Sequence, residues 1–184
     1  MKKSYPIIHI IGLPGSGKTT LANKLSKVLK LPVYRIGTYR AKYLQSDIGE
    51  ADAWVSLFKD LSRRKWKNSI LETTGLNGRE SFLRNAFHFT QIVTIKLEAP
   101  RKILYQRIKK KKKSEQGGDW LFSVSYQDKQ EFVRKLFKEF VKIPAQIRID
   151  TNKHGIMEVF KFVREKLEKY LDLYEIIERS AQDE

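Results

Sequence analysis

A glycine-rich stretch, GLPGSGKTT at residues 12–20, limits the fold of this chain more than any other part of its sequence. It matches the pattern of a glycine, four residues of any kind, then glycine, lysine and serine or threonine. A loop that wraps a di- or triphosphate must turn successive backbone N–H groups inward, and glycines allow that curvature. Lys18 is expected to contact the β- and γ-phosphates, and Thr19 to offer its hydroxyl to bound Mg²⁺. The predicted nucleotide-binding residues are Gly12, Pro14, Gly15, Ser16, Gly17, Lys18, Thr19 and Thr20.

The segments on either side of this stretch argue against a chance match. Before it, the apolar residues of 7–11 indicate a buried parallel strand, and after it apolar residues recur through 21–29 at helical spacing. A strand followed by the loop and then by a helix is the context that the pattern requires. A helix that opens at Lys18 also directs the positive end of its dipole at a bound anion. We therefore expect an ATP or GTP phosphate site here.

Length, composition and charge set broader limits. At 184 residues the chain is expected to form a single domain, residues 1–184, and its lack of cysteine excludes disulfides, thiolate metal sites and thiol nucleophiles. No apolar stretch approaches the length of a membrane span, so we expect a cytoplasmic protein with no membrane partner. The net charge of +16 favours polyanionic partners such as nucleotides and sugar phosphates. The same charge leaves nucleic acid open as a partner.

Residues 31–36 predict a second strand, which ends at Gly37 and Thr38, with Arg40 just beyond. In open α/β sheets, ligands bind beyond the carboxyl ends of the strands. Thr38, Tyr39 and Arg40 are thus expected to face the same crevice as the phosphate-binding loop, and Thr38 and Arg40 to contact the acceptor. The alternative is that Arg40 is an ordinary surface arginine.

Residues 69–74 predict a third strand that carries an acid, Glu72, near its end. A carboxylate placed there beside a phosphate-binding loop holds the metal or takes a proton from an acceptor hydroxyl. The alternative is a solvated carboxylate at a strand end. Residues 75–79 are then expected to turn the chain into a helix that carries the apolar residues of 82–87, and Arg79 in its first turn is a candidate contact for an anionic acceptor.

A strongly basic segment follows Pro100, at which a further helix is expected to begin. Residues 101–113 carry eight basic side chains and no acid, and Gly117 and Gly118 come shortly after. Such a segment is suited to be a lid that folds over bound triphosphate and excludes water, with the glycine pair as its hinge. The alternative is a solvated lysine tail of a helix. Arg107, before the lysine run, is the better candidate for a transition-state contact.

The remaining sequence alternates between helical and strand patterns. Apolar spacing predicts a helix over residues 46–65, a strand at 91–97, a helix around 132–141, a strand at 145–149 and a long helix from 155 onward. We find no internal repeat and no linker. The chain is therefore expected to be an α/β domain with a parallel sheet of about five strands, covered by helices on both faces. His9 lies in the first strand and is interpreted as a hydrogen-bonded core histidine.

Four segments together resemble the small P-loop kinases: GLPGSGKTT, RIGTYR, ILETTGLNGRE and QIRIDT. This group contains nucleoside monophosphate kinases, polynucleotide 5′-hydroxyl kinases and the kinase half of 6-phosphofructo-2-kinase. The resemblance implies a P-loop NTPase sheet of order 2-3-1-4-5, a basic lid over about residues 107–120 and adenine packing near the segment after Asp150. GTYR is similar to the acceptor-binding arginine segment of the sugar-phosphate kinase. Polynucleotide kinases usually place an aspartate base shortly before the equivalent of Arg40, where this chain has Gly37 and Thr38.

The leading hypothesis is an ATP- and Mg²⁺-dependent phosphotransferase that acts on a small phosphorylated acceptor, such as a nucleotide or a sugar phosphate. The chemistry requires charge neutralisation and positioning, and no covalent intermediate on the protein. The residues expected to act are Lys18 and Arg107 on the transferred phosphoryl group, Thr19 and Glu72 on the metal, and Thr38, Arg40 and Arg79 on the acceptor.

Two alternatives remain open at this point. One is a polynucleotide kinase or another hydroxyl kinase, for which Glu72 would have to act as the base. The other is a nucleic-acid-binding ATPase, in which the lysine run binds the phosphates of the nucleic acid and ATP hydrolysis causes a conformational change. Stimulation of ATP hydrolysis by nucleic acid, with a steep salt dependence, would distinguish the second.

Overall fold

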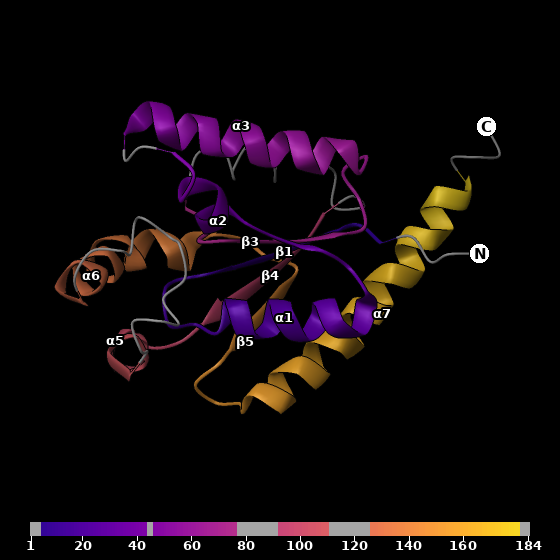
Figure 1. Ribbon diagram of the computed structural model, residues 1–184. Coiled ribbons are helices and arrows are strands. Elements are labelled where there is room, and N and C mark those ends of the chain that lie inside the picture. Colours follow the sequence, from indigo (N-terminus) through magenta and orange to yellow (C-terminus); the bar gives the residue numbers. More distant parts are fainter. Residues whose placement is uncertain (1–4, 44–45, 77–91, 111–125, 181–184) are drawn as a thin grey trace.

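A five-stranded parallel sheet forms the centre of the computed structural model, which describes residues 5–43, 46–76, 92–110 and 126–180 (Figure 1). Each neighbouring pair of strands runs parallel, and the spatial order is β2-β3-β1-β4-β5. This order confirms the expected α/β class and topology. The strands are β1 (Ile7–Gly12), β2 (Val33–Arg35), β3 (Ser69–Thr73), β4 (Ile92–Glu98) and β5 (Ile147–Asp150).

Helices cover both faces of the sheet, as the buried strands require. In Figure 1, α2 and α3 lie on one side of the sheet, and α1 and α7 lie on the other. Near the carboxyl end of β4, α5 and α6 pack against each other and complete the cover. The helices are α1 (Lys18–Leu29), α2 (Ile36–Arg40), α3 (Asp47–Arg63), α5 (Arg101–Lys110), α6 (Tyr126–Lys142) and α7 (Ile156–Ser180).

The side chains of β1 supply both halves of the core, because successive residues of a strand point to opposite faces. Ile8 and Ile10 are buried against apolar residues of α1 and α7. Ile7 packs in a cluster with residues of α2 and α3, and Ile11 packs in a third cluster with residues of α5 and α6. Every residue of β1 is buried, which fixes the strand that leads into the phosphate-binding loop.

The second strand is shorter than the sequence predicts, and this is the main difference from the expected elements. It ends at Arg35, and residues 36–40 form the short helix α2 in place of a strand end and loop. Ile36 and Tyr39, three residues apart, both turn inward and pack in the cluster beneath α3. Helical spacing thus buries two apolar side chains that a strand would place on opposite faces.

Other boundaries shift by a few residues. The helix expected over 46–65 spans Asp47–Arg63, with Ser46 as its N-cap accepting a hydrogen bond from Gly49 N at 3.0 Å. The fifth strand starts at Ile147 and not at residue 145, because Thr94 N bonds the side chain of Gln146 at 2.9 Å and not its backbone. The helix expected after the turn at 75–79, and the lid segment beyond residue 110, lie outside the described residues, which stop at residues 76 and 110.

A buried lysine on β4 anchors the end of α6. The Lys96 side chain is 0% exposed and donates to the carbonyl oxygens of Val141 at 2.8 Å and Ile143 at 3.0 Å. It also pairs with Glu98 Oε1 at 2.9 Å and lies over the ring of Phe140, 4.8 Å from its centroid. Burial alone would raise the pKa of Glu98, but hydrogen bonds from Lys96 and Arg148 outweigh it and lower that pKa. The ammonium therefore has four partners in a dry environment.

We expect Lys96→Met to destabilise the protein by about 3–5 kcal/mol, because it leaves Glu98 and two carbonyls of the α6 terminus without their donor. Arg148→Ala is the matched control, since it removes the other cation on Glu98 from an exposed position and should cost about 1 kcal/mol or less. Urea unfolding of the two variants and the wild type measures the difference. Similar losses in both variants would contradict the anchoring role of Lys96.

Candidate functional site

The loop between β1 and α1 has the conformation that a phosphate cradle requires. Gly15 has a φ of 81° and Gly17 a φ of 92°, a backbone region that other residues rarely adopt. A Cβ at Gly15 would lie 2.8 Å from the carbonyl oxygen of Leu104, so glycine is required there by space as well as by φ. Gly17 is the N-cap of α1 and carries no side-chain cap, so the open N–H groups of the helix face the loop.

The side chains of the loop fit a bound polyphosphate. The hydroxyl of Ser16 is buried and has no hydrogen-bond partner within the part of the chain that the structure describes. Lys18 curls back to donate to Leu13 O at 3.3 Å, which holds its ammonium over the loop. Pro14 is half-buried, and Thr19 and Thr20 are exposed in the first turn of α1. A buried donor without an acceptor, next to open helix N–H groups, is suited to receive phosphate oxygens.

Thr19 and Glu72, the two predicted metal ligands, lie in direct contact. Thr19 Oγ1 donates to Glu72 Oε1 at 2.6 Å, although the two residues are far apart in the sequence. The second carboxylate oxygen, Oε2, accepts from Arg35 Nε at 2.9 Å. Glu72 is only 8% exposed. The carboxylate is therefore oriented from two sides at the edge of the phosphate-binding loop.

Arg107 joins the loop to the carboxyl end of the sheet. It donates through Nη1 to Thr151 Oγ1 at 2.8 Å and through Nη2 to Thr151 O at 2.7 Å, with a longer contact of 3.5 Å to Gly15 O. Thr151 is held in turn, because its N and Oγ1 both donate to Glu98 O. The guanidinium thus lies beside the loop, while its contact with a transferred phosphoryl group stays a prediction.

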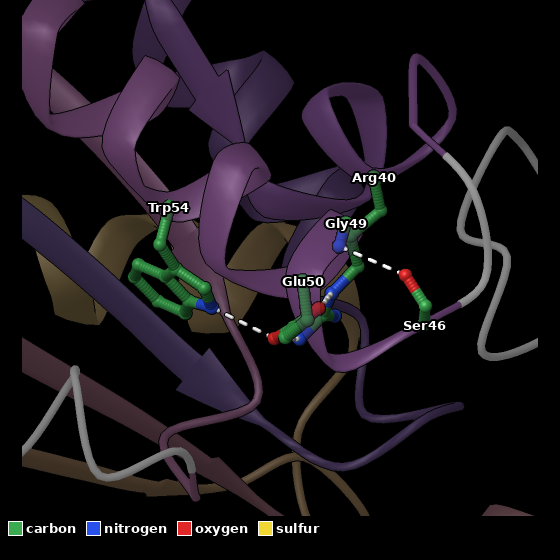
Figure 2. Close-up of polar contacts among 5 residues, drawn as sticks. All are labelled: Arg40, Ser46, Gly49, Glu50 and Trp54. Atoms are coloured by element: carbon green, nitrogen blue, oxygen red, sulfur yellow. Dashed lines mark hydrogen bonds and ion pairs between the residues drawn. The ribbon is translucent and has the colours of Figure 1, made fainter.

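Arg40 lies in a buried ion pair and not on an open crevice wall. Its side chain is 3% exposed, and its Nε and Nη2 donate to the two oxygens of Glu50, each at 2.7 Å. Glu50 also accepts from Trp54 Nε1 at 2.8 Å, and Figure 2 shows this cluster beside the Ser46 cap of α3. The structure differs here from the expectation of an arginine facing the acceptor, because the guanidinium is used to hold α2 against α3.

The neighbours of Arg40 on α2 point in different directions. Thr38 is exposed, as an acceptor contact requires. Tyr39 does not face the crevice as expected, because it is buried beneath α3 and its hydroxyl donates to Asp60 Oδ2 at 2.7 Å. Burial and that hydrogen bond raise the pKa of Tyr39. Arg79, the other predicted acceptor residue, lies outside the described residues, so its placement is not tested.

Two residues of this region were missed by the sequence analysis, Arg35 and Glu50. Arg35 was interpreted only as part of a strand, although its register opposite Glu72 follows once β2 and β3 are neighbours. Glu50 stands four residues before Trp54 on α3, and this helical spacing is the signal that would have placed the acid beside the indole.

No cluster of three or more metal-ligating side chains is found in the ranges 5–43, 46–76, 92–110 and 126–180. Mg²⁺ in phosphate-transfer sites is commonly held by one or two protein oxygens together with phosphate and water, so the Thr19–Glu72 pair fits it. His9 is a core residue, with Nε2 2.8 Å from Thr73 Oγ1, as interpreted from the sequence. No helix in the described ranges is long and apolar enough to cross a membrane.

Comparison with known protein families identifies the family of this chain. The AAA_18 family model, described as an AAA domain, matches residues 8–134. The chain belongs to this family. The match includes the phosphate-binding loop, Glu72 and Arg107, and together with the sheet order it confirms the P-loop kinase fold inferred from the sequence. A comparison with curated protein sequences finds no significant match.

Several solved structures with the same fold are named as kinases of small molecules. Shikimate kinase from Aquifex aeolicus is 22% identical with a TM-score of 0.59, and covers 88% of this chain and 96% of its own. A sugar kinase from Janibacter sp. HTCC2649 is 14% identical with a TM-score of 0.64, over 89% of this chain and 95% of its own. Deoxyadenosine kinase from M. mycoides with bound dATP is 19% identical with a TM-score of 0.54, over 88% and 99%. At these identities the likeness establishes the fold.

We expect Gly15→Ala to destabilise the protein more than Gly17→Ala. Both positions have positive φ, which costs a non-glycine residue about 1–2 kcal/mol. Only at Gly15 would the new methyl also meet a backbone carbonyl, whereas nothing lies within 4 Å of a Cβ at Gly17. Thermal unfolding of the two variants without nucleotide measures this. Equal losses would mean that the loop does not pack against α5 as the structure shows.

Proposed function

We propose that the protein is an ATP- and Mg²⁺-dependent kinase that transfers a phosphoryl group to a small-molecule acceptor. The observation that carries the proposal is the direct contact between Thr19 on the phosphate-binding loop and Glu72 on β3. A hydroxyl at the start of the loop helix, backed by a carboxylate, is what a magnesium–nucleotide site needs. Family membership and the dATP bound to the deoxyadenosine kinase of the same fold support a nucleotide as the donor.

The residues around the phosphate-binding loop would each have a separate role in this reaction. The loop N–H groups and Lys18 would hold the phosphates, and the Ser16 hydroxyl would gain the acceptor that it lacks among the described residues. Thr19 and Glu72 would hold Mg²⁺, which neutralises phosphate charge when it is bound. Arg107 lies beside Gly15, where a cation opposes negative charge that develops on the transferred group.

We further propose that the acceptor nucleophile is itself a phosphate. Both oxygens of Glu72 already accept hydrogen bonds, from Thr19 and from Arg35, so the carboxylate is engaged with the loop helix and β2 and not directed at an acceptor hydroxyl. Residues 36–40, which form α2 directly after β2, carry no carboxylate either. A phosphate monoester is already largely anionic near neutral pH, because its second pKa is about 6, and it needs no base. Thr38, exposed on α2, and Arg79 are the proposed acceptor contacts, with Arg40 holding α2 in place.

A hydroxyl acceptor is the second candidate, and the related structures favour it. Shikimate, a sugar and deoxyadenosine, for which three proteins of this fold are named, all carry hydroxyl groups. For this candidate, Glu72 would have to accept the hydroxyl proton in addition to its present bonds. Nucleic acid is proposed only as a further partner, since exposed Lys109 and Lys110 at the end of α5 add positive charge beside the site.

Binding of ATP should depend on Lys18. ATP with Mg²⁺ at about 100 times its dissociation constant is expected to stabilise the wild type by about 2.7 kcal/mol, which thermal unfolding detects. Lys18→Ala should lose most of that gain, because the loop then lacks its charge on the phosphates. Lys27→Ala, an exposed lysine in the last turn of the same helix, is the matched control and should keep it. Equal stabilisation of both variants would contradict the role of Lys18.

The acceptor class is tested by a screen in which each nucleoside or sugar is paired with its phosphate ester under ATP and Mg²⁺, with products measured by mass spectrometry. We expect transfer to the ester. Glu72→Gln should then lower turnover mainly by weakening Mg²⁺ binding, so that high Mg²⁺ restores most of the rate. Transfer to the dephosphorylated members, with a turnover loss in Glu72→Gln that Mg²⁺ does not restore, would establish the hydroxyl candidate instead.

A further inference from the structure

Arg35 lies close to the candidate site but has no part in the function proposed above. It is the last residue of β2, and its side chain is 32% exposed. Its guanidinium has two partners on two different elements: Nε donates to Glu72 Oε2 at 2.9 Å, and Nη2 donates to Asn23 Oδ1 on α1. The arginine therefore links the second strand, the third strand and the helix that follows the phosphate-binding loop.

The strand register explains one half of this link. Arg35 and Glu72 are directly paired across β2 and β3, and Glu72 is paired in turn with Ile10 of β1. Paired residues of adjacent strands have their side chains on the same face of the sheet. Ile10 packs with the buried residues of α1, so Arg35 and Glu72 are directed toward that helix. Any shift of register by one residue would turn one of them to the opposite face.

Helical spacing explains the other half. Thr19 and Asn23 are four residues apart on α1 and lie on one face of the helix, one turn from each other. Thr19 donates to Glu72, and Asn23 accepts from Arg35. The four side chains thus form a chain of three hydrogen bonds between two strands and one helix, and both ends of this chain lie on α1. Two contacts one turn apart resist rotation of α1 about its axis, which a single contact would allow.

We propose that Arg35 is a positioning residue for the metal site, acting through Glu72 and Asn23 on the hydroxyl of Thr19. This inference rests on the proposed function, because it assumes that Thr19 and Glu72 receive Mg²⁺ with ATP. By occupying Oε2, Arg35 leaves Oε1 to orient Thr19, and its contact with Asn23 holds the first turns of α1 at the angle that this bond needs. Groups that orient a metal ligand in this way are commonly worth 10–100-fold in metal affinity.

The test separates metal-dependent from metal-free binding of the same nucleotide. Titration calorimetry measures the affinity for ATP with excess Mg²⁺ and with excess chelator, and the ratio of the two affinities is the quantity of interest. Arg35→Gln is expected to lower this ratio by about tenfold while leaving the affinity for metal-free ATP within about twofold. Arg35→Lys keeps the charge but reaches only one of the two partners, so its ratio should fall between that of Arg35→Gln and the wild type. Arg164→Gln, an exposed arginine paired with Glu168 on α7, is the charge-matched control and should leave the ratio unchanged.

A double-variant cycle shows whether Arg35 acts through Glu72. If it does, Arg35→Gln should have little further effect on the ratio in a Glu72→Gln background. Full additivity of the two changes would overturn the inference. An equal loss of affinity for metal-free and metal-bound ATP in Arg35→Gln would overturn it too, because such a loss indicates a purely structural role. If the wild-type protein binds ATP equally with and without Mg²⁺, the proposed function itself is refuted. If the wild type prefers ATP with Mg²⁺ and Arg35→Gln has the same affinity ratio, only the role of Arg35 is refuted.

Discussion

Parallel pairing of β1 with β3 and with β4 is the constraint on which the site depends. It brings the carboxyl ends of these strands to one edge, where Ile11 is paired with Thr73 on one side and Gly12 with Leu97 on the other. The phosphate-binding loop leaves β1 at that edge, so Glu72 on the neighbouring strand comes within reach of Thr19. These two residues are far apart in the sequence, and their contact exists only when the sheet has this order.

Charged side chains then fix the helices around this edge, each with partners that offset the cost of burial. Arg40 and Glu50 join α2 to α3, and Lys96 with Glu98 joins the end of α6 to β4. A buried charge that loses its partner is strongly destabilising, so such pairs resist displacement of the elements that carry them. Among the described basic residues, Arg35, Arg40 and Lys96 each bond groups of the protein itself and are not placed to bind anions.

The parts of the structure that sequence analysis predicted are those whose signals are local. The order of strand, glycine loop and helix at residues 7–29 follows from hydrophobic spacing and from conformations that only glycine adopts easily, and it was predicted to within a residue. The prediction failed at residues 36–40, where a short helix replaced the strand end, because its stability comes from packing of Ile36 and Tyr39 under α3. Arg40 lies beyond the end of β2, but in place of the expected open crevice wall it has a buried pairing with Glu50, which depends on a helix that begins seven residues later.

Arg107 shows how contacts far from the loop determine what lies beside it. Its guanidinium is held by both oxygens of Thr151, and Thr151 is held by the carbonyl of Glu98. The Glu98 side chain binds Lys96, which donates to the carbonyl of Val141 in the last turn of α6 and to that of Ile143 just after the helix. A continuous chain of polar contacts therefore runs from the end of α6 through β4 and β5 to Arg107 and the loop at Gly15. Because α5 carries Arg107, any movement of this helix must break the two Thr151 bonds or carry Thr151 with it. The position of the cation beside the loop is thus set by the sheet as much as by its own helix.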